Sequence, residues 1–172
     1  GVLTGKGLEW GGSLMRPQAT GFGATYFAEA MLKTRGEAFD GKKVALSGFG
    51  NVAWGAARKI ADLGGKAVTL SGPDGFIHDP DGVLGEKIDY MLEMRASNND
   101  RVEDYAKRFG VPFFAGRRPW EVPVDVAMPC ATQNELDVED AKNLLKNGCT
   151  WVTEVANMPT TLEATKILQG AK

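Results

Sequence analysis

The spacing of apolar residues along the chain alternates between a period typical of helices and short continuous runs typical of buried strands. Over residues 19–33 the apolar positions recur every three or four residues, at Phe22, Tyr26, Phe27, Ala30 and Met31. This spacing predicts an amphipathic helix with these side chains on its apolar face. Val44 to Leu46 is instead a short apolar run, as in a strand that is buried on both faces of a parallel sheet.

The rest of the chain repeats this alternation. Helical spacing predicts further helices over 52–63, 86–97, 101–109, 138–145 and 160–168, with Asp100 as the N-cap of the third of these. Apolar runs predict strands over 67–70, 111–114, 124–128 and 150–153. The segment 71–83 is dense in Gly, Pro and Asp, which predicts a loop with a small hairpin around Phe76 and Ile77 and with His78 in solvent.

Strands and helices in alternation indicate an α/β domain with helices on both faces of a mostly parallel sheet. We therefore expect a Rossmann-type, doubly wound fold. The runs give five strands, where a complete fold of this class usually has about six, so the domain is expected to be truncated before its final strand. One domain over 1–172 is predicted, with a lead-in loop and helix over 1–36 and the Rossmann core over 43–168.

A glycine-rich segment follows the first predicted strand. It reads Gly48-Phe49-Gly50-Asn51-Val52-Ala53 and fits G-x-G-x-x-G/A, a pattern too short to mean much alone in a chain with 22 glycines. Here it leaves a predicted strand directly and opens a predicted helix within a βαβ unit. That context is typical of a dinucleotide-binding turn.

Each residue type in this turn has a physical role. Gly48 permits the tight bend, Gly50 lets a diphosphate approach the backbone, and Ala53 keeps the helix close to the strand. The amide groups of Asn51 and Val52, with the positive end of the helix, would hold the pyrophosphate without a basic side chain. A glycine turn that serves packing alone is the alternative.

The end of the second predicted strand bears on the choice between NAD and NADP. In this fold an acid about 20 residues beyond the glycines usually accepts the adenosine ribose hydroxyls. Here Ser71, Gly72 and Pro73 precede Asp74, so the acid comes late and the strand tip is neutral. Residues 70–81 contain no basic side chain other than His78 to bind a ribose phosphate, which favours NAD and makes NADP the less favoured cofactor. These aspartates could instead serve only to make turns.

Composition narrows the classes of partner. The net charge is −2 and the pI is near 5.5, so there is no basic surplus to bind nucleic acid or an anionic membrane. No apolar run reaches the roughly 18 residues of a membrane span, and the first residues lack a signal-peptide pattern, which favours the cytoplasm. Cys130, Cys149 and His78 are too few ligands for a structural zinc site. We therefore expect no metal and two reduced thiols.

Three longer stretches carry a family resemblance. They read KGLEWGGSLMRPQATGFG over 6–23, MPCATQNEL over 128–136 and EVANMPTT over 154–161. The chain resembles the small-subunit hexameric glutamate dehydrogenases along essentially its whole length. The segments SGFGNVAWG and SGPDG look most like the NAD-dependent clostridial branch.

The resemblance implies a reaction and roles for particular residues. The reaction is oxidative deamination of L-glutamate to 2-oxoglutarate and ammonia, carried out by a homo-hexamer, with hydride passing to the nicotinamide. Thr20 would bind the nicotinamide carboxamide, Asn51 would contact the pyrophosphate or ribose, and Asn157 would face the nicotinamide. Ala131 and Thr132 would line the adenosine and ribose region, at the end of a predicted parallel strand.

The resemblance also implies that the residues holding glutamate, and the acid–base residues, belong to a domain before Gly1. We therefore expect this chain to bind the cofactor but not to turn over glutamate, with no catalytic residue of its own. Glu9, Asp125 and Glu154 are acid–base candidates by residue type only, and Arg117-Arg118 is expected to form a solvated turn, with phosphate binding as the alternative. A branched-chain or aromatic amino-acid dehydrogenase, and a non-catalytic dinucleotide-binding module, remain alternative functions.

Overall fold

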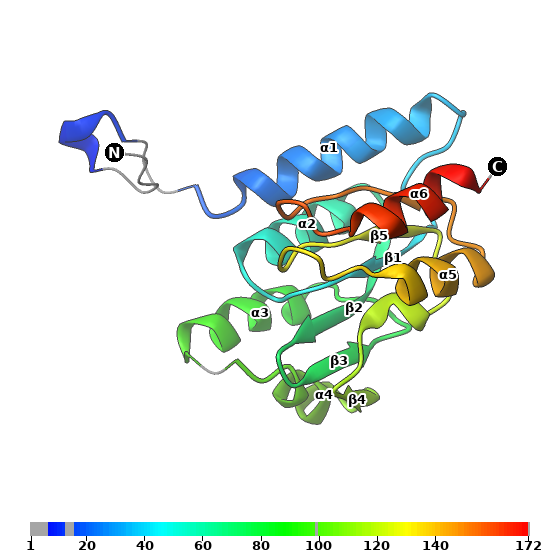
Figure 1. Cartoon of the computed structure of the whole chain (residues 1–172). Helices are drawn as coiled ribbons and strands as arrows, with labels where there is room; N and C mark the ends of the chain where they lie inside the picture. Colours follow the sequence, from blue (N-terminus) through cyan, green and yellow to red (C-terminus); the bar gives the residue numbers. More distant parts are fainter. Residues whose placement is uncertain (1–6, 13–15, 99, 172) are drawn as a thin grey trace.

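A six-stranded sheet with helices on both faces forms the body of the protein (Figure 1). The structure, a computed structural model, describes residues 7–12, 16–98 and 100–171. Lys6 and residues 13–15, which belong to the first of the three family-like stretches, lie outside the described residues, as do residues 1–5 of the expected lead-in loop. Within the described part, no helix is long and apolar enough to cross a membrane.

The elements alternate along the chain as the apolar pattern predicts. The strands are β1 (Lys43–Leu46), β2 (Lys66–Gly72), β3 (Gly75–His78), β4 (Phe113–Ala115), β5 (Val126–Met128) and β6 (Trp151–Val152). The α-helices are α1 (Ala19–Lys33), α2 (Asn51–Asp62), α3 (Glu86–Ala96), α4 (Glu103–Phe109), α5 (Val138–Lys146) and α6 (Leu162–Gly170). Two short 3-10 helices, η1 (Leu8–Trp10) and η2 (Pro119–Glu121), complete the described elements.

The sheet has the strand order β4-β3-β2-β1-β5-β6, with β1 near its centre. Val44 of β1 pairs in parallel with Ala67 of β2 on one side and with Val126 of β5 on the other. The chain thus leaves β1 first toward β2 and later returns to its opposite edge at β5. A reversal of this kind opens a crevice at the carboxyl ends of the strands, where ligands bind in open α/β sheets.

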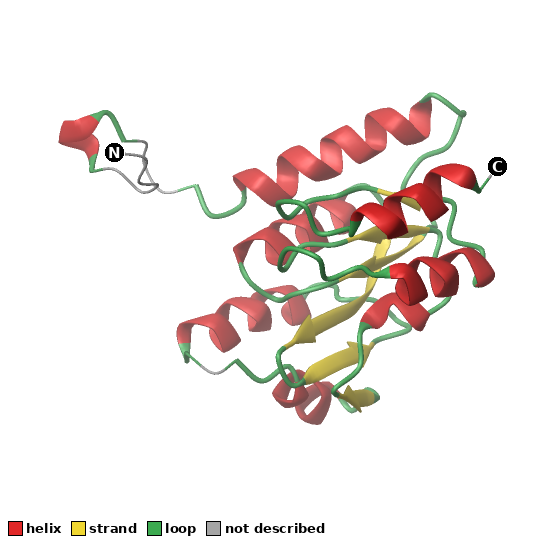
Figure 2. Ribbon diagram, viewed as in Figure 1, coloured by secondary structure: helices red, strands yellow, loops and turns green. Residues whose placement is uncertain are grey.

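Helices cover both faces of the sheet (Figure 2), and an apolar core lies beneath each layer of helices. Val44 and Leu46 belong to the core that α1, α2, α3 and α4 cover, whereas Ala45 belongs to the core beneath η2, α5 and α6. Alternate residues of β1 therefore serve opposite faces, as the strand period of two requires. The expected Rossmann-type, mostly parallel α/β fold is confirmed.

The number of strands differs from the sequence-based count of five. The hairpin expected around Phe76 forms a full sheet member, β3, which pairs antiparallel with β2 and with β4. His78 is the last residue of β3, pairs with Thr69 and is half-buried, so the prediction of a solvated loop position was wrong. The reason is that a tight turn at Gly72 to Gly75 adds a strand to the sheet edge without the helix that a parallel strand needs.

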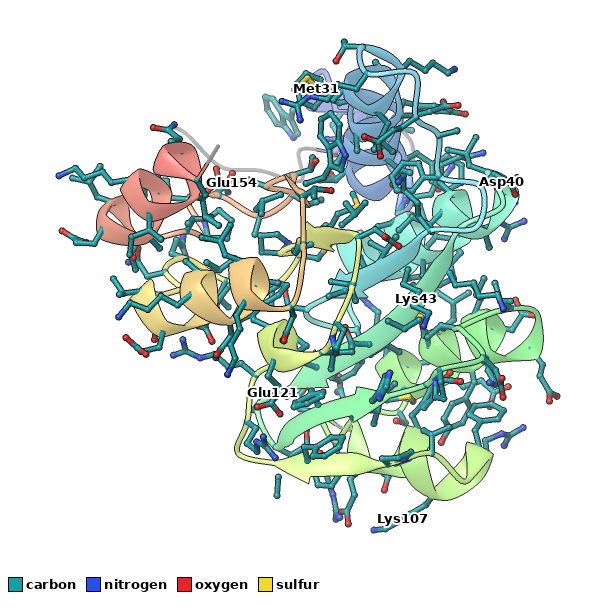
Figure 3. The ribbon with its side chains drawn as sticks, turned by 90° about the vertical axis from the view of Figure 1, so that its right-hand side faces the viewer. Met31, Asp40, Lys43, Lys107, Glu121 and Glu154 are labelled. Carbon is teal, nitrogen blue, oxygen red and sulfur yellow. The ribbon has the colours of Figure 1, made fainter. Side chains whose placement is uncertain are left out.

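Helix α1 buries a different face from the one the apolar spacing indicated. Tyr26, Phe27 and Met31 are 52%, 61% and 41% exposed, and Figure 3 shows Met31 on the outer side of α1. The buried positions of the helix are Gly21, Thr25, Ala28 and Leu32. A Cβ atom on Gly21 would lie 2.3 Å from the backbone nitrogen of Ala56, so the two helices touch backbone to backbone. Small residues therefore decide how α1 docks on α2.

Candidate functional site

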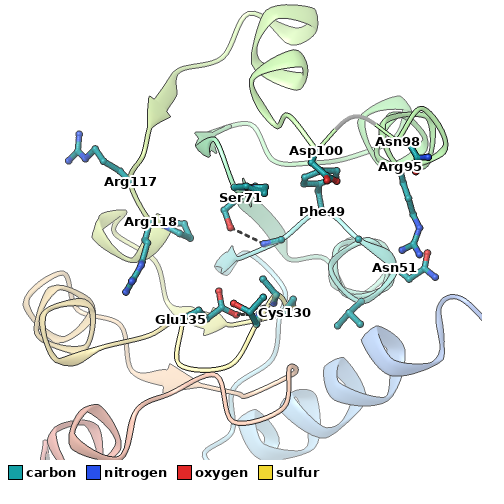
Figure 4. A pocket seen from close by; sticks show the side chains of 18 residues that line it. Phe49, Asn51, Ser71, Arg95, Asn98, Asp100, Arg117, Arg118, Cys130 and Glu135 are labelled. Carbon is teal, nitrogen blue, oxygen red and sulfur yellow. Dashed lines mark hydrogen bonds between the residues drawn. The ribbon is translucent and has the colours of Figure 1, made fainter. Parts of the chain in front are cut away.

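A pocket of about 950 Å³ opens at the carboxyl ends of β1, β2 and β5 (Figure 4). Its walls come from the β1–α2 turn, the end of β2, the end of α3, the segment before η2 and the β5–α5 loop. The sequence-predicted binding residues that line it are Gly48, Phe49, Gly50, Asn51, Val52, Ser71, Pro73, Ala131 and Thr132. Residues that are far apart in the sequence thus meet at the crevice that the strand order creates.

The glycine turn forms the floor of this pocket. Gly48 has a φ of +74°, and a Cβ there would sit 3.3 Å from the Cβ of Ala131. Gly50 is the N-cap of α2 and gives that helix no side-chain cap, so the amide groups of its first turn have no partner within the helix. Among the described residues, and apart from the chain neighbours of Gly50, the nearest atom to a Cβ at this position would be Nη1 of Arg95, at 3.5 Å. The turn is therefore open on the side that an anion would approach.

Ser71 fixes the turn to the end of β2. The Gly48 amide donates to Ser71 Oγ at 2.9 Å, and the Ser71 amide donates back to the Gly48 carbonyl oxygen at 3.3 Å. This reciprocal pair extends the β1–β2 contact beyond the ladder of the strands. It therefore fixes the position of the turn after β1, the predicted phosphate site, relative to the end of β2, the predicted ribose site.

The β5–α5 loop is held by a half-buried acid that the sequence reasoning did not single out. Glu135 Oε1 accepts the amide hydrogens of Ala131 and Thr132 at 2.9 and 3.2 Å. Burial raises the pKa of Glu135, while hydrogen bonds from Ser47 and from the two amides oppose that rise. Ser47 Oγ in turn accepts from the Cys130 amide at 2.8 Å. The QNEL part of the family-like stretch was the available signal for Glu135.

Three arginines border the pocket and give it positive charge. Arg117 pairs with Glu121, and Arg118 pairs with Asp137 and Asp140 at 2.9 and 2.7 Å. Both side chains are exposed in the turn before Pro119, as expected, and they line the site while paired with acids. Arg95 has no ion-pair partner among the described residues, and in Figure 4 it reaches from α3 toward Asn51. No local motif marks Arg95, which is why the turn was expected to lack a basic side chain.

Four of the predicted residues do not line the pocket. Ala53 is buried beneath it, where it packs α2 on the sheet, as the motif requires. Thr20 on α1 and Asn157 in the segment after β6 are both exposed. Asp74 turns its carboxylate away to the start of α4 and accepts the amides of Val102 and Glu103 at 3.1 and 2.9 Å. The expected cap of that helix, Asp100, lines the pocket instead.

The remaining chemistry-bearing candidates lie outside the pocket or are inert. Burial raises the pKa of the Cys130 thiol and raises that of Cys149 to about 11, and both cysteines are free thiols, as expected. Glu9 and Glu154 are exposed elsewhere, and Asp125 accepts the amide of Lys43 at the opposite end of the sheet. In the described part of the chain, no group of three or more His, Cys, Asp or Glu could hold a metal ion.

Comparison with known proteins places this geometry in context. A sequence model of the glutamate/leucine/phenylalanine/valine dehydrogenase family matches residues 11–172. The NAD-specific glutamate dehydrogenase of Clostridium symbiosum is 60% identical over 98% of this chain and 38% of its own length. The NADP-specific glutamate dehydrogenase of Haemophilus influenzae is 53% identical over 99% of the chain and 38% of its own length.

A solved structure named glutamate dehydrogenase superposes with a TM-score of 0.91 at 59% identity. That superposition covers 98% of this chain and 38% of the solved one. The chain therefore spans well under half the length of the proteins that it matches.

Proposed function

Because this chain belongs to the glutamate/leucine/phenylalanine/valine dehydrogenase family, we propose that it is the NAD-binding domain of a glutamate dehydrogenase. One observation carries the proposal. The turn over 48–53 forms the floor of a pocket at the carboxyl ends of parallel strands, with the open amide groups of α2 facing it. The extent of the domain is proposed as 1–172, with 43–168 as its Rossmann core.

The groups around the turn fit a diphosphate. Gly50 leaves room for it, and the first amides of α2, at Asn51 and Val52, supply donors at the positive end of a helix. Arg95 adds a cation within reach of the same point. The sequence alone predicted the amides, and the fold brings the arginine to them.

The two ends of the cofactor would lie on opposite sides of this turn. Ser71 and Pro73 at the end of β2 would flank the adenosine half, with Ala131 and Thr132 forming the wall across the pocket. Thr20 and Asn157 would face the nicotinamide half, from α1 and from the segment after β6. When bound, the nicotinamide accepts a hydride from the α-carbon of the amino acid. The residues of this chain bind and orient the cofactor for that transfer.

NAD is the proposed cofactor. Residues 70–81, where the adenosine ribose would lie, contribute no arginine or lysine to bind a ribose phosphate. Relatives named NAD-specific and NADP-specific both match along nearly the whole chain, so overall similarity does not settle the preference. The local charge does argue for NAD.

Isothermal titration of the purified chain with NAD and with NADP tests the proposal. We expect NAD to bind, NADP to bind more weakly, and adenosine diphosphate to compete with NAD for one site. Neither cofactor binding at millimolar concentration would contradict the proposal. NADP binding more tightly than NAD would overturn the assignment of the cofactor.

The substrate, the inactivity of the isolated chain and the assembly of the whole protein are further parts of the proposal. Without a positioned amino acid, a bound cofactor gains none of the orientation that speeds hydride transfer. We therefore expect no glutamate-dependent formation of NADH by the chain alone, and activity with glutamate by a homo-hexameric whole protein. Activity of the whole protein on leucine, valine or phenylalanine but not on glutamate would contradict the substrate.

A further inference from the structure

The acid that follows β2 is already engaged by the protein. Both carboxylate oxygens of Asp74 accept backbone amides, from Val102 and from Glu103, where α4 begins. Its carbonyl oxygen accepts the amide of Gly116 at 2.9 Å. Asp74 therefore joins three segments, the β2–β3 turn, the start of α4 and the end of β4, and both oxygens of its carboxylate are engaged by backbone amides.

Gly72 makes this arrangement possible. A Cβ at Gly72 would lie 2.6 Å from Oδ1 of Asp74 and 3.1 Å from Cε1 of Phe49. Asp74 thus folds back across the tip of β2 through space that only a glycine leaves open. A side chain at position 72 would push the carboxylate off the helix start or displace the Phe49 ring.

A second acid lies at the same corner of the pocket. Asp100 lines the pocket together with Ser71, Gly72 and Pro73, and its carbonyl oxygen lies 3.4 Å from the Cβ position of Gly72. In Figure 4 Asp100 lies on the same side of the pocket as Ser71 and next to Phe49. The hydrogen bonds that Asp74 accepts from the amides of residues 102 and 103 hold the segment that carries Asp100 against the tip of β2.

The charges around this corner favour a neutral, hydroxyl-bearing ligand. Arg101, the nearest cation in the sequence, pairs with Glu103, and Glu103 also pairs with Lys107 at 3.1 Å. Arg95 reaches toward Asn51, with Nη1 3.5 Å from the Cβ position of Gly50. Asp100 has no ion-pair partner among the described residues, and Arg117 and Arg118 are paired with other acids. A carboxylate in that situation accepts hydroxyl hydrogens and repels a phosphate.

We infer that Asp100, and not Asp74, is the acid that faces the adenosine ribose and selects NAD over NADP, and that Asp74 is a positioning residue. The inference rests on the proposed function, because it assumes a dinucleotide in the pocket. It assigns the two acids separable effects. Asp100 acts on the ratio of the NAD and NADP dissociation constants, and Asp74 acts on the stability of the corner formed by β2, α4 and β4.

The test compares Asp100→Asn and Asp74→Ala with the unaltered chain. Each protein is titrated calorimetrically with NAD and with NADP, and each is unfolded in urea without cofactor. Asp100→Asn is expected to weaken NAD binding about tenfold and to narrow or reverse the preference over NADP, because hydrogen bonds to a charged acceptor are the stronger ones. Its urea midpoint is expected to match that of the unaltered chain. Asp74→Ala is expected to lower the urea midpoint and to leave the ratio of the two dissociation constants unchanged.

Two results would overturn the inference. One is an unchanged NAD to NADP ratio in Asp100→Asn, and the other is an altered ratio in Asp74→Ala without loss of stability. If the unaltered chain binds neither cofactor, the proposed function fails together with the role of Asp100. The urea midpoints then still decide whether Asp74 holds the start of α4, so the two failures are distinguishable.

Discussion

The amide of Gly48 donates a 2.9 Å hydrogen bond to the hydroxyl of Ser71, which joins the turn after β1 to the end of β2. Gly48 adopts a φ of +74°, a left-handed conformation that glycine tolerates and that costs other residues about 1–2 kcal/mol. The pocket floor is therefore set by backbone conformation and one serine, before any ligand arrives. The two glycines of the turn should consequently respond differently to substitution.

Replacing each glycine of the turn by alanine separates folding from binding. Gly48→Ala is expected to lower the free energy of unfolding by about 1–2 kcal/mol, because its φ is positive. Gly50 has a φ of −74°, and its nearest neighbour at the Cβ position, Arg95 Nη1, lies at ordinary contact distance. Gly50→Ala is therefore expected to lose at most about 1 kcal/mol of stability, because alanine is a poorer N-cap than glycine. It is expected to weaken NAD binding at least about tenfold, because the methyl group fills the approach of the diphosphate.

Urea unfolding and calorimetric titration of both variants check these outcomes. Full NAD affinity in Gly50→Ala would show that the diphosphate does not approach the backbone at this glycine. Unchanged stability in Gly48→Ala would show that the turn relaxes without cost.

Glu135 provides a second prediction, about the wall of the pocket. Glu135→Ala removes the acceptor of the Ala131 and Thr132 amides, at an expected cost of about 1–3 kcal/mol in stability, and weakens NAD binding as the loop loosens. Glu135→Gln keeps a carbonyl oxygen at the same place and should retain most of the stability and most of the affinity for NAD. Equal losses in the two variants would mean that the charge of Glu135, rather than its role as an acceptor, holds the loop.

The docking of α1 on α2 can be tested within one helix. Gly21→Ala places a methyl group 2.3 Å from the backbone nitrogen of Ala56, so the helices must separate, at an expected cost of about 1–3 kcal/mol. Gly23→Ala is the matched control, because its Cβ position has no neighbour within 4 Å. Alanine there should stabilise the chain by about 0.5–1 kcal/mol. The melting temperatures of the two variants are compared by thermal unfolding. Similar shifts of the melting temperature, with the same sign, would refute the close contact between the helices.

Some features of the fold were predictable from the sequence, and others depend on contacts between distant segments. The βαβ unit and its turn were predictable because periodicity and glycine spacing are local properties of the chain. The docking face of α1 was not, because Gly21 and Ala28 add almost nothing to an apolar pattern yet let two backbones touch. The helix end that Asp74 caps lies 28 residues further along, and no local signal encodes such a partner.

The site shows the same division. Nine of the predicted residues line one pocket because the motif and the strand ends that carry them are fixed by topology. Arg95 and Asp100 escaped prediction as pocket residues, since they reach it from the end of α3 and the segment beyond it. For the antiparallel hairpin of β3, the loop composition was interpreted correctly as a turn, but it did not indicate that the strand beyond it joins the sheet.

His78 gives a prediction about pH that a single variant isolates, because it is the only histidine in the chain. Burial, with the positive charge of Lys43, lowers the pKa of His78 below its ordinary value of 6.5, and Asp79 only partly opposes this. The unfolded chain therefore binds the proton more readily than the folded one. The stability that depends on neutral His78 is present above pH 6.5 and is lost as the pH falls through the folded-state pKa.

His78→Gln removes this loss while leaving every carboxylate in place. Urea unfolding of both proteins from roughly pH 7.5 to 5.5 is expected to show the unaltered chain losing stability relative to the variant, since no other side chain ordinarily titrates in that range. A difference in stability that stays constant across the range, or that favours the unaltered chain at low pH, would show that His78 on β3 is not held neutral by its surroundings.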